Sequence, residues 1–207
     1  MESSEPDGVV IAAIRAGQTE RFDELARRYS GALWRLAYSR LRNRHVADDV
    51  VQETLLAAFR WLGSYDSRYS FRTWLWTILL NECRRALAKQ ARRREVAPLS
   101  SSDFEGPMPP SLIDDDRPHQ RLLLEERAAM LEQLLVRLPE PEADALRLRF
   151  FGDLKFQEIA DILGCSLSTA KYRVRDGLAQ LGRWLATDDQ PAVPTTPSSP
   201  ATKDPSS

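Results

Sequence analysis

The sequence predicts an all-α protein with two small helical domains, a flexible acidic linker between them and a disordered C-terminal tail. Apolar residues recur at helical spacing in both halves of the 207-residue chain, and no segment alternates like a strand. Proline, serine and acidic residues dominate two other segments, a composition typical of chain that builds no core. The predicted boundaries are 8–94 for the first domain, 95–117 for the linker, 118–186 for the second domain and 187–207 for the tail.

Four helices are predicted in the first domain. Gly17 should close the first helix, Thr19 should cap the second and Ser70 the fourth. Asp48 and Asp49 should lie in the first turn of the third helix, where the helix dipole favours acids. The predicted ranges are 9–16, 19–41, 46–62 and 71–93, with a loop at 63–70.

The second domain is predicted to contain a helix-turn-helix motif in "EIADILGCSLSTAKYRVRDGL", residues 158–178. Before it, Pro139 should break one helix and Pro141 should lie in the first turn of the next. In the motif, Ala160 allows the two helices to approach closely, Gly164 allows a left-handed turn and Ser166 can cap the second helix. Six apolar residues should hold that second helix on the domain: Leu163, Leu167, Ala170, Val174, Leu178 and Leu181.

The outer face of this second helix is basic and polar, as expected of a helix that enters the DNA major groove. The residues on or beside it are Thr169, Lys171, Tyr172, Arg173 and Arg175. An ordinary helical hairpin with a solvated basic face is the alternative, but the spacing of Ala160 and Gly164 favours DNA binding.

Charge is distributed unevenly along a chain whose net charge is only −1. Residues 68–94 carry eight Lys or Arg against one acid, whereas residues 103–126 carry seven acids against two Arg. Such asymmetry points to charged partners. The N-terminus does not look like a secretory signal and no apolar run could span a bilayer, so we expect a soluble cytoplasmic protein without membrane insertion. Cys83 and Cys165 do not have metal-ligand spacing, and no metal or other cofactor is expected.

The third predicted helix contains "ADDVVQETLLAAF", in which Asp49, Gln52, Glu53 and Leu56 share one face. On spacing alone, this is most simply a solvated surface. Pairing Asp49 with Glu53 as general acid and base would suggest an enzyme. We do not favour this interpretation, because no histidine, metal ligand or glycine-rich loop lies nearby in sequence.

The fourth predicted helix ends in a strongly basic segment, with six Lys or Arg between Arg84 and Arg94. Helix-dipole complementation needs fewer cations than this. Aromatic side chains beside a basic helix suit single-stranded DNA, because bases stack on rings while phosphates meet cations. Of the two tryptophans near the start of the helix, Trp74 is expected in the core and Trp76 is expected to be the more exposed.

Taken in order, these motifs resemble the extracytoplasmic-function (ECF) sigma factors, the smallest members of the primary bacterial sigma family. The resemblance rests on "DDVVQET", on "WLWTILLN" followed by a basic run, and on "LPEPEADALRLRFFGDLKFQEIADILG" followed by a helix-turn-helix, over about residues 20–94 and 125–186. It implies a promoter-specificity subunit of RNA polymerase without catalytic activity. A free-standing helix-turn-helix regulator is the alternative, but it would leave the first-domain motifs unused.

The resemblance also implies partners and contact residues. The partners would be promoter DNA, the largest and second-largest subunits of core RNA polymerase and, as in many members, an anti-sigma factor, although no residue here identifies one. The acidic linker would thread the RNA exit path. Core polymerase would be bound by Asp48, Asp49, Gln52 and Glu53, the minus-ten element by Tyr65, Asp66, Tyr69, Ser70, Trp76, Asn81, Arg84 and Arg85, and the minus-thirty-five element by Thr169, Lys171, Tyr172, Arg173 and Arg175.

The recognition helix departs from the usual family pattern. The common Gly-Thr-Val-Lys-Ser-Arg is here "STAKYR", with Ser168 in place of glycine and Tyr172 in place of serine. Lys155 stands where a serine or threonine cap is usual. We therefore expect this protein to prefer a different base sequence in the minus-thirty-five element, the upstream element of the promoter, than proteins with the usual family pattern.

Overall fold

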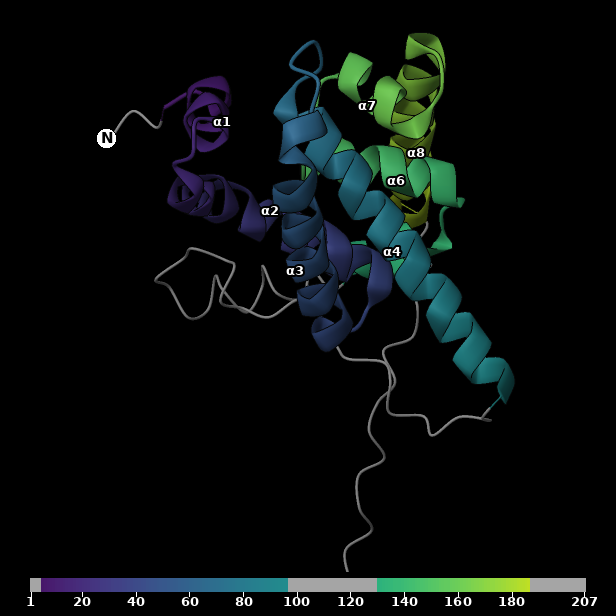
Figure 1. Ribbon diagram of the computed structural model, residues 1–207. Coiled ribbons are helices and arrows are strands. Elements are labelled where there is room, and N and C mark those ends of the chain that lie inside the picture. Colours follow the sequence, from purple (N-terminus) through teal and green to yellow (C-terminus); the bar gives the residue numbers. More distant parts are fainter. Residues whose placement is uncertain (1–4, 97–129, 187–207) are drawn as a thin grey trace, which may run out of the picture.

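The structure is a computed structural model that describes residues 5–96 and 130–186, and every regular element in those ranges is a helix (Figure 1). The predicted all-α class is confirmed. The expected linker from residue 97 onward and the expected tail at 187–207 lie outside the described residues. We call residues 5–96 the first unit and residues 130–186 the second unit. The elements are α1 (Asp7–Arg15), η1 (Thr19–Arg21), α2 (Phe22–Leu41), α3 (Arg44–Trp61), η2 (Leu62–Ser64), α4 (Phe71–Val96), a helix described over 130–137, α6 (Glu140–Phe150), α7 (Phe156–Leu163) and α8 (Leu167–Ala186).

In the first unit, α2, α3 and α4 pack on one another, and α1 covers the start of α2 (Figure 1). Each helix contributes an apolar stripe to a shared core, as helical periodicity requires. Leu33 of α2, Ala47 of α3 and Leu79 of α4 are fully buried there. The C-terminal part of α4 extends beyond the other helices (Figure 1).

The helix starts of the first unit differ in part from the predictions. Gly17 does end α1, with φ +107°, and Ser70 does cap α4, because its Oγ accepts a 3.0 Å hydrogen bond from the Thr73 N–H. The predicted Thr19 cap is wrong. Residues 19–21 form a 3₁₀ turn before α2 begins, and Thr19 therefore lies three residues before the first turn of α2.

The third helix begins earlier than predicted. Asn43 caps it by accepting a 2.9 Å hydrogen bond from the Val46 N–H, so α3 starts at Arg44. Asp48 and Asp49 consequently lie beyond the first turn, contrary to the prediction. They gain correspondingly less from the helix dipole, whose influence falls off within that turn.

In the second unit, the prolines and the motif turn are where the sequence predicts them. The helix at 130–137 ends before Pro139, which occupies the cap position of α6, and Pro141 lies in the first turn of α6. Gly164 links α7 to α8 in the left-handed conformation, with φ +60°. Ser166 caps α8 by accepting a 3.1 Å hydrogen bond from the Thr169 N–H. The helix-turn-helix geometry is thus fixed by local backbone chemistry.

The buried stripe of α8 is partly different from the predicted one. Leu167 and Leu178 are 38% and 46% exposed, so the expectation that they pack on the domain is wrong. The stripe instead consists of Ala170, Val174, Gly177 and Leu181. Gly177 belongs to it because α6 approaches α8 closely: a Cβ atom at this position would lie 2.9 Å from Leu146 Cδ1.

The two units are in contact in this structure. α6 packs on α2 and α7 packs on α4 (Figure 1). The buried apolar side chains of both units form one continuous cluster. Within the described ranges, no helix is both long and apolar enough to cross a membrane.

Candidate nucleic-acid interface

One exposed face of α3 carries acidic, amide and apolar side chains together. Asp49, Gln52 and Glu53 are exposed, and Leu56 beside them is 47% exposed. The structure therefore brings these residues to one surface, as the helical spacing predicts. Asp48 belongs to a different environment: it is partly buried and accepts a 2.6 Å hydrogen bond from the Trp34 indole nitrogen.

The C-terminal end of α3 exposes aromatic side chains that the sequence analysis did not single out. Phe59 is 41% exposed although its ring contacts Phe22, with centroids 5.2 Å apart. Trp61 is 50% exposed. Periodicity gives no signal for this, because an apolar residue at the edge of a buried stripe looks the same in sequence whether or not a neighbouring helix covers it.

The segment between α3 and α4 is held in place by Arg15 of α1. The guanidinium donates hydrogen bonds to the main-chain oxygens of Leu62, at 2.8 Å, and Tyr65. The Tyr65 ring is buried, its hydroxyl donates a 2.6 Å hydrogen bond to the Tyr69 main-chain oxygen, and burial raises its pKa. Tyr65 therefore supports the loop from inside and is not itself a surface residue.

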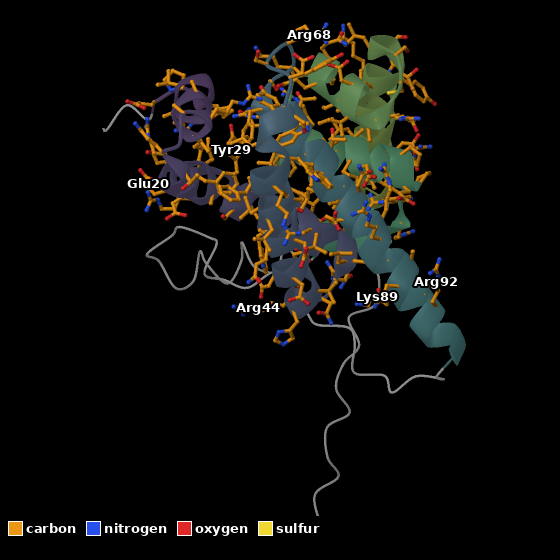
Figure 2. All side chains as sticks on the ribbon, viewed as in Figure 1. Glu20, Tyr29, Arg44, Arg68, Lys89 and Arg92 are labelled. Atoms are coloured by element: carbon orange, nitrogen blue, oxygen red, sulfur yellow. The ribbon has the colours of Figure 1, made fainter. Side chains whose placement is uncertain are left out.

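The tip of this loop presents polar and aromatic groups to solvent. Asp66 accepts hydrogen bonds from the Arg68 side chain, at 2.7 Å, and from the Arg68 N–H, at 3.0 Å, and these bonds lower the pKa of Asp66. The ring of Tyr69 is 57% exposed. Figure 2 shows Arg68 at the end of this loop, pointing away from the helices.

The solvent-facing side of α4 is basic. Asn81, Arg84 and Arg85 are exposed, and Arg84 donates a 3.0 Å hydrogen bond to Asn81 Oδ1. Lys89 and Arg92 continue the row on the part of α4 that extends beyond the other helices (Figure 2). This side of α4 is a ready surface for phosphate groups.

Trp76 lies elsewhere, and the expectation that it is the more exposed tryptophan is wrong. It is only 1% exposed, whereas Trp74 is partly buried. The second unit covers it: a Cβ atom added at Gly152 would lie 3.3 Å from Trp76 Cε2. Ser70, at the start of α4, also meets the second unit, because its hydroxyl donates a 2.9 Å hydrogen bond to Glu158 Oε1.

The N-terminal half of α8 presents the predicted recognition residues. Lys171, Tyr172 and Arg175 are exposed, whereas Thr169 and Arg173 are half-buried at the flank. The Arg175 guanidinium lies 5.8 Å from the centroid of the Tyr172 ring, within the range of a cation–π contact. The two side chains therefore form one composite surface on the exposed face.

The two cysteines are free thiols in different environments: Cys83 is buried and Cys165 is partly exposed. Cys83 is fully buried, and burial raises the pKa of its thiol to about 12. In the part of the chain that the structure describes, no cluster of three or more His, Cys, Asp or Glu side chains could hold a metal ion.

Comparisons with known proteins agree with this division into two units. The family model for Sigma-70 region 2 matches residues 25–93, and the model for Sigma-70 region 4 matches residues 128–181. These two matches define the class: a sigma-70-type protein with a region 2 in its first unit and a region 4 in its second.

Individual relatives narrow the class further. The chain is 30% identical over 171 residues to the ECF RNA polymerase sigma-E factor of Salmonella typhimurium strain LT2, covering 81% of this chain and 88% of the relative. Two solved structures share the fold. CnrH, in complex with the cytosolic domain of CnrY, has a TM-score of 0.65 at 25% identity and covers 89% of this chain and 99% of its own. RpoE of Bartonella quintana, in complex with the anti-sigma factor NepR, has a TM-score of 0.58 at 23% identity, and the match covers 76% of this chain and 91% of RpoE.

The chain belongs to the family of ECF RNA polymerase sigma factors, the promoter-specificity subunits of bacterial RNA polymerase. The family and function that the sequence motifs predict are therefore confirmed. The comparisons give no support to a free-standing helix-turn-helix regulator.

Proposed function

We propose that this sigma factor binds core polymerase through α3, the minus-ten element through residues 65–70 and α4, and the minus-thirty-five element through α8. The observation that carries the proposal is that each of the three surfaces is exposed and chemically distinct: acidic and apolar on α3, aromatic and basic around α4, basic on α8. We propose the predicted domain boundaries, 8–94 and 118–186, as the functional ones.

On α3, the exposed group of Asp49, Gln52, Glu53 and Leu56 suits a protein partner. A protein interface combines apolar contact area with charged and amide groups that fix its register. The exposed aromatic ring of Phe59 extends the apolar part of this surface. Asp48 would act differently from the other acids, because its carboxylate is already engaged by Trp34.

Around α4, we propose that Tyr69 stacks on an unpaired base of the minus-ten element while Arg84 and Arg85 contact phosphates. Stacking on an aromatic ring and neutralisation by a basic groove are the usual means of binding single-stranded DNA. The buried Tyr65 and the internally bonded Asp66 hold the loop in shape for this contact. Asn81 is exposed beside the arginines and can donate to or accept from a base edge.

On α8, the exposed residues lie near the N-terminal end that normally meets base edges. Arg175 can donate two hydrogen bonds to a guanine, and Lys171 can neutralise a phosphate. The ring of Tyr172 can contact a thymine methyl group or a sugar. Thr169 and Arg173 are half-buried at the flank of α8 and would contact the sugar-phosphate backbone of the DNA.

The protein itself supplies no catalytic group in this proposal, and polymerase performs the chemistry. We place it in the cytoplasm, where bacterial DNA and polymerase are found. RpoE binds the anti-sigma factor NepR in its solved complex, and we propose a regulatory partner of that kind here as well.

The assignment of α3 can be tested by replacing Asp49, Gln52 and Glu53 together by alanine. None of the three is buried and alanine favours helix, so circular dichroism should stay unchanged. Pull-down of core polymerase should fail. The control variant Glu20→Ala/Asp23→Ala removes exposed acids near the start of α2 and should bind normally. Normal binding by the triple variant would overturn the assignment.

The assignment of α8 can be tested by in vitro transcription with the reconstituted holoenzyme, using a promoter that the holoenzyme itself selects from a random pool. Arg175→Ala should lower transcription from it, since one bidentate contact to guanine contributes about 1–3 kcal/mol of discrimination. Tyr172→Ser should change the preferred upstream sequence without abolishing activity. If Arg175→Ala lowers transcription equally from promoters with scrambled upstream elements, Arg175 does not read bases.

A further inference from the structure

Tyr172 and Arg175 are three residues apart on α8 and contact each other on its exposed face. The ring of Tyr172 is 51% exposed, and the guanidinium carbon of Arg175 lies over that ring, 5.8 Å from its centroid. Residues three apart are neighbours on a helix surface, so this contact needs no other helix. The outer surface of α8 therefore presents an aromatic ring and a cation together, and we call Tyr172 and Arg175 the ring–cation pair.

The guanidinium of Arg175 keeps its hydrogen-bond donors available. Among the described residues no carboxylate forms an ion pair with it, and the neighbouring Asp176 instead accepts a 2.8 Å hydrogen bond from Gln180 Nε2. Arg149 of α6, by contrast, donates a 2.8 Å hydrogen bond to the Leu154 main-chain oxygen. An arginine that is stacked on a ring and still has its N–H groups available can bond to both acceptor atoms of a guanine.

The helix that carries the ring–cation pair is anchored before and after it. Ser166 caps α8 by accepting a 3.1 Å hydrogen bond from the Thr169 N–H. Gly177 lies directly against α6, where an added Cβ atom would be 2.9 Å from Leu146 Cδ1. Because α8 is fixed on both sides of the pair and the ring already orients the guanidinium, less conformational entropy is lost when the pair binds DNA.

The spacing within the ring–cation pair suits two neighbouring base pairs. Successive base pairs of a duplex are about 3.4 Å apart along the axis, so the 5.8 Å between guanidinium and ring exceeds one step and is less than two. With the guanidinium in the plane of a guanine, the ring of Tyr172 lies beside the adjacent base pair. The apolar group that a ring can contact there is the C5-methyl group of a pyrimidine, which projects into the major groove.

We propose that the ring–cation pair recognises a step of two base pairs, in which Arg175 bonds to a guanine and Tyr172 packs on the C5-methyl group of a pyrimidine in the adjacent pair. Thymine supplies this methyl group in unmodified DNA, and 5-methylcytosine presents the same group at the same position. The inference rests on the proposed function of α8 and extends it from single contacts to a base step. Tyr172 is also a positioning residue, because its ring holds the guanidinium of Arg175.

Three substitutions separate the roles of ring, hydroxyl and charge. Tyr172→Ser installs the residue that is usual in the family, which can neither stack on a guanidinium nor cover a methyl group. Tyr172→Phe is the matched control, because it keeps the ring and removes only the hydroxyl. Lys171→Ala removes an exposed cation from the same turn and is the control for phosphate contact. All these side chains are exposed, so circular dichroism should show unchanged folding.

The experiment uses the holoenzyme reconstituted with the full-length protein and a promoter duplex that this holoenzyme selects from a random pool. The selected upstream elements should contain a guanine whose adjacent base pair includes a thymine. Deoxyuridine in place of that thymine deletes the methyl group and leaves base pairing unchanged. Competition against a labelled promoter, followed by fluorescence anisotropy at one fixed salt concentration, measures the affinity for each duplex.

We expect deoxyuridine to weaken binding by the wild type about fourfold, which is the effect of leaving one methyl group uncovered. A 5-methylcytosine at that position should bind more tightly than unmodified cytosine. Tyr172→Phe should behave like the wild type, whereas Tyr172→Ser should bind the thymine and deoxyuridine duplexes equally. Arg175→Ala should weaken binding less in the Tyr172→Ser background than in the wild type, because the two side chains act together. Lys171→Ala should weaken binding to all duplexes alike.

Several outcomes would overturn the inference. The wild type could bind the thymine and deoxyuridine duplexes equally, 5-methylcytosine could bind no more tightly than cytosine, or Tyr172→Ser could keep the discrimination. Loss of discrimination in Tyr172→Phe would also overturn it, because the hydroxyl and not the ring would then make the contact. A selected upstream element without the predicted step overturns this inference alone. If the holoenzyme selects no upstream element at all, the proposed function of α8 fails and the inference fails with it.

Discussion

The close approach of α6 and α8 at Gly177 predicts opposite effects for the same substitution at two sites in one helix. Gly182→Ala should stabilise the protein by about 0.5–1 kcal/mol, because alanine is the better helix former and a Cβ there meets nothing within 4 Å. At Gly177, a Cβ would lie 2.9 Å from Leu146 Cδ1 and 3.3 Å from Leu146 Cγ. Leu146 is 2% exposed and has no open space in solvent to move into.

The two opposing effects at Gly177 can be compared in size. The gain in helix propensity is about 1 kcal/mol, whereas overpacking a filled core costs about 1–3 kcal/mol. Gly177→Ala should therefore range from neutral to about 2 kcal/mol less stable than the wild type, and it should always be less stable than Gly182→Ala. For a unit of this size, 1 kcal/mol corresponds to about 4–8 °C in melting temperature.

Thermal and urea unfolding followed by circular dichroism would measure the difference. Gly177→Ala should also weaken transcription from promoters that depend on the upstream element, because the position of α8 on α6 sets the orientation of Lys171 and Arg175. If both variants stabilise the protein equally, a side chain at position 177 fits between α6 and α8, and the close packing of these two helices at Gly177 is wrong.

Two further predictions concern other parts of the fold. At pH 8, a maleimide should label Cys165 and leave Cys83 unmodified, because burial raises the pKa of Cys83 to about 12 and keeps its reactive thiolate scarce. In urea both cysteines should react, and mass spectrometry would count the labels in each case. Labelling of Cys83 in the native protein would contradict its burial. Arg15→Ala should destabilise the protein by about 1–3 kcal/mol and slow promoter opening, because the main-chain oxygens of Leu62 and Tyr65 lose a charged donor. Urea unfolding and permanganate footprinting of the open complex would measure the two effects, and an unchanged footprint would show that Arg15 does not support the loop.

Local chemistry explains why the sequence alone predicts so much of this protein. The helices follow from apolar periodicity, the break at Pro139 from the missing N–H of proline, and the turn at Gly164 from the freedom of glycine to adopt φ +60°. That Asp49, Gln52 and Glu53 share one face follows from their spacing within one helix. Each of these features depends on residues within a few positions of one another.

The tertiary structure decided everything that depends on a distant neighbour. Trp76 is buried because Gly152 of the other unit lies over it, and Asp48 is engaged because Trp34 of another helix donates to it. Leu178 is exposed because the close approach of α6 at Gly177 sets the rotation of α8. Periodicity states which residues of a helix share a face, but the burial of that face depends on which surface packs against it, and a single helix carries no information about its partner.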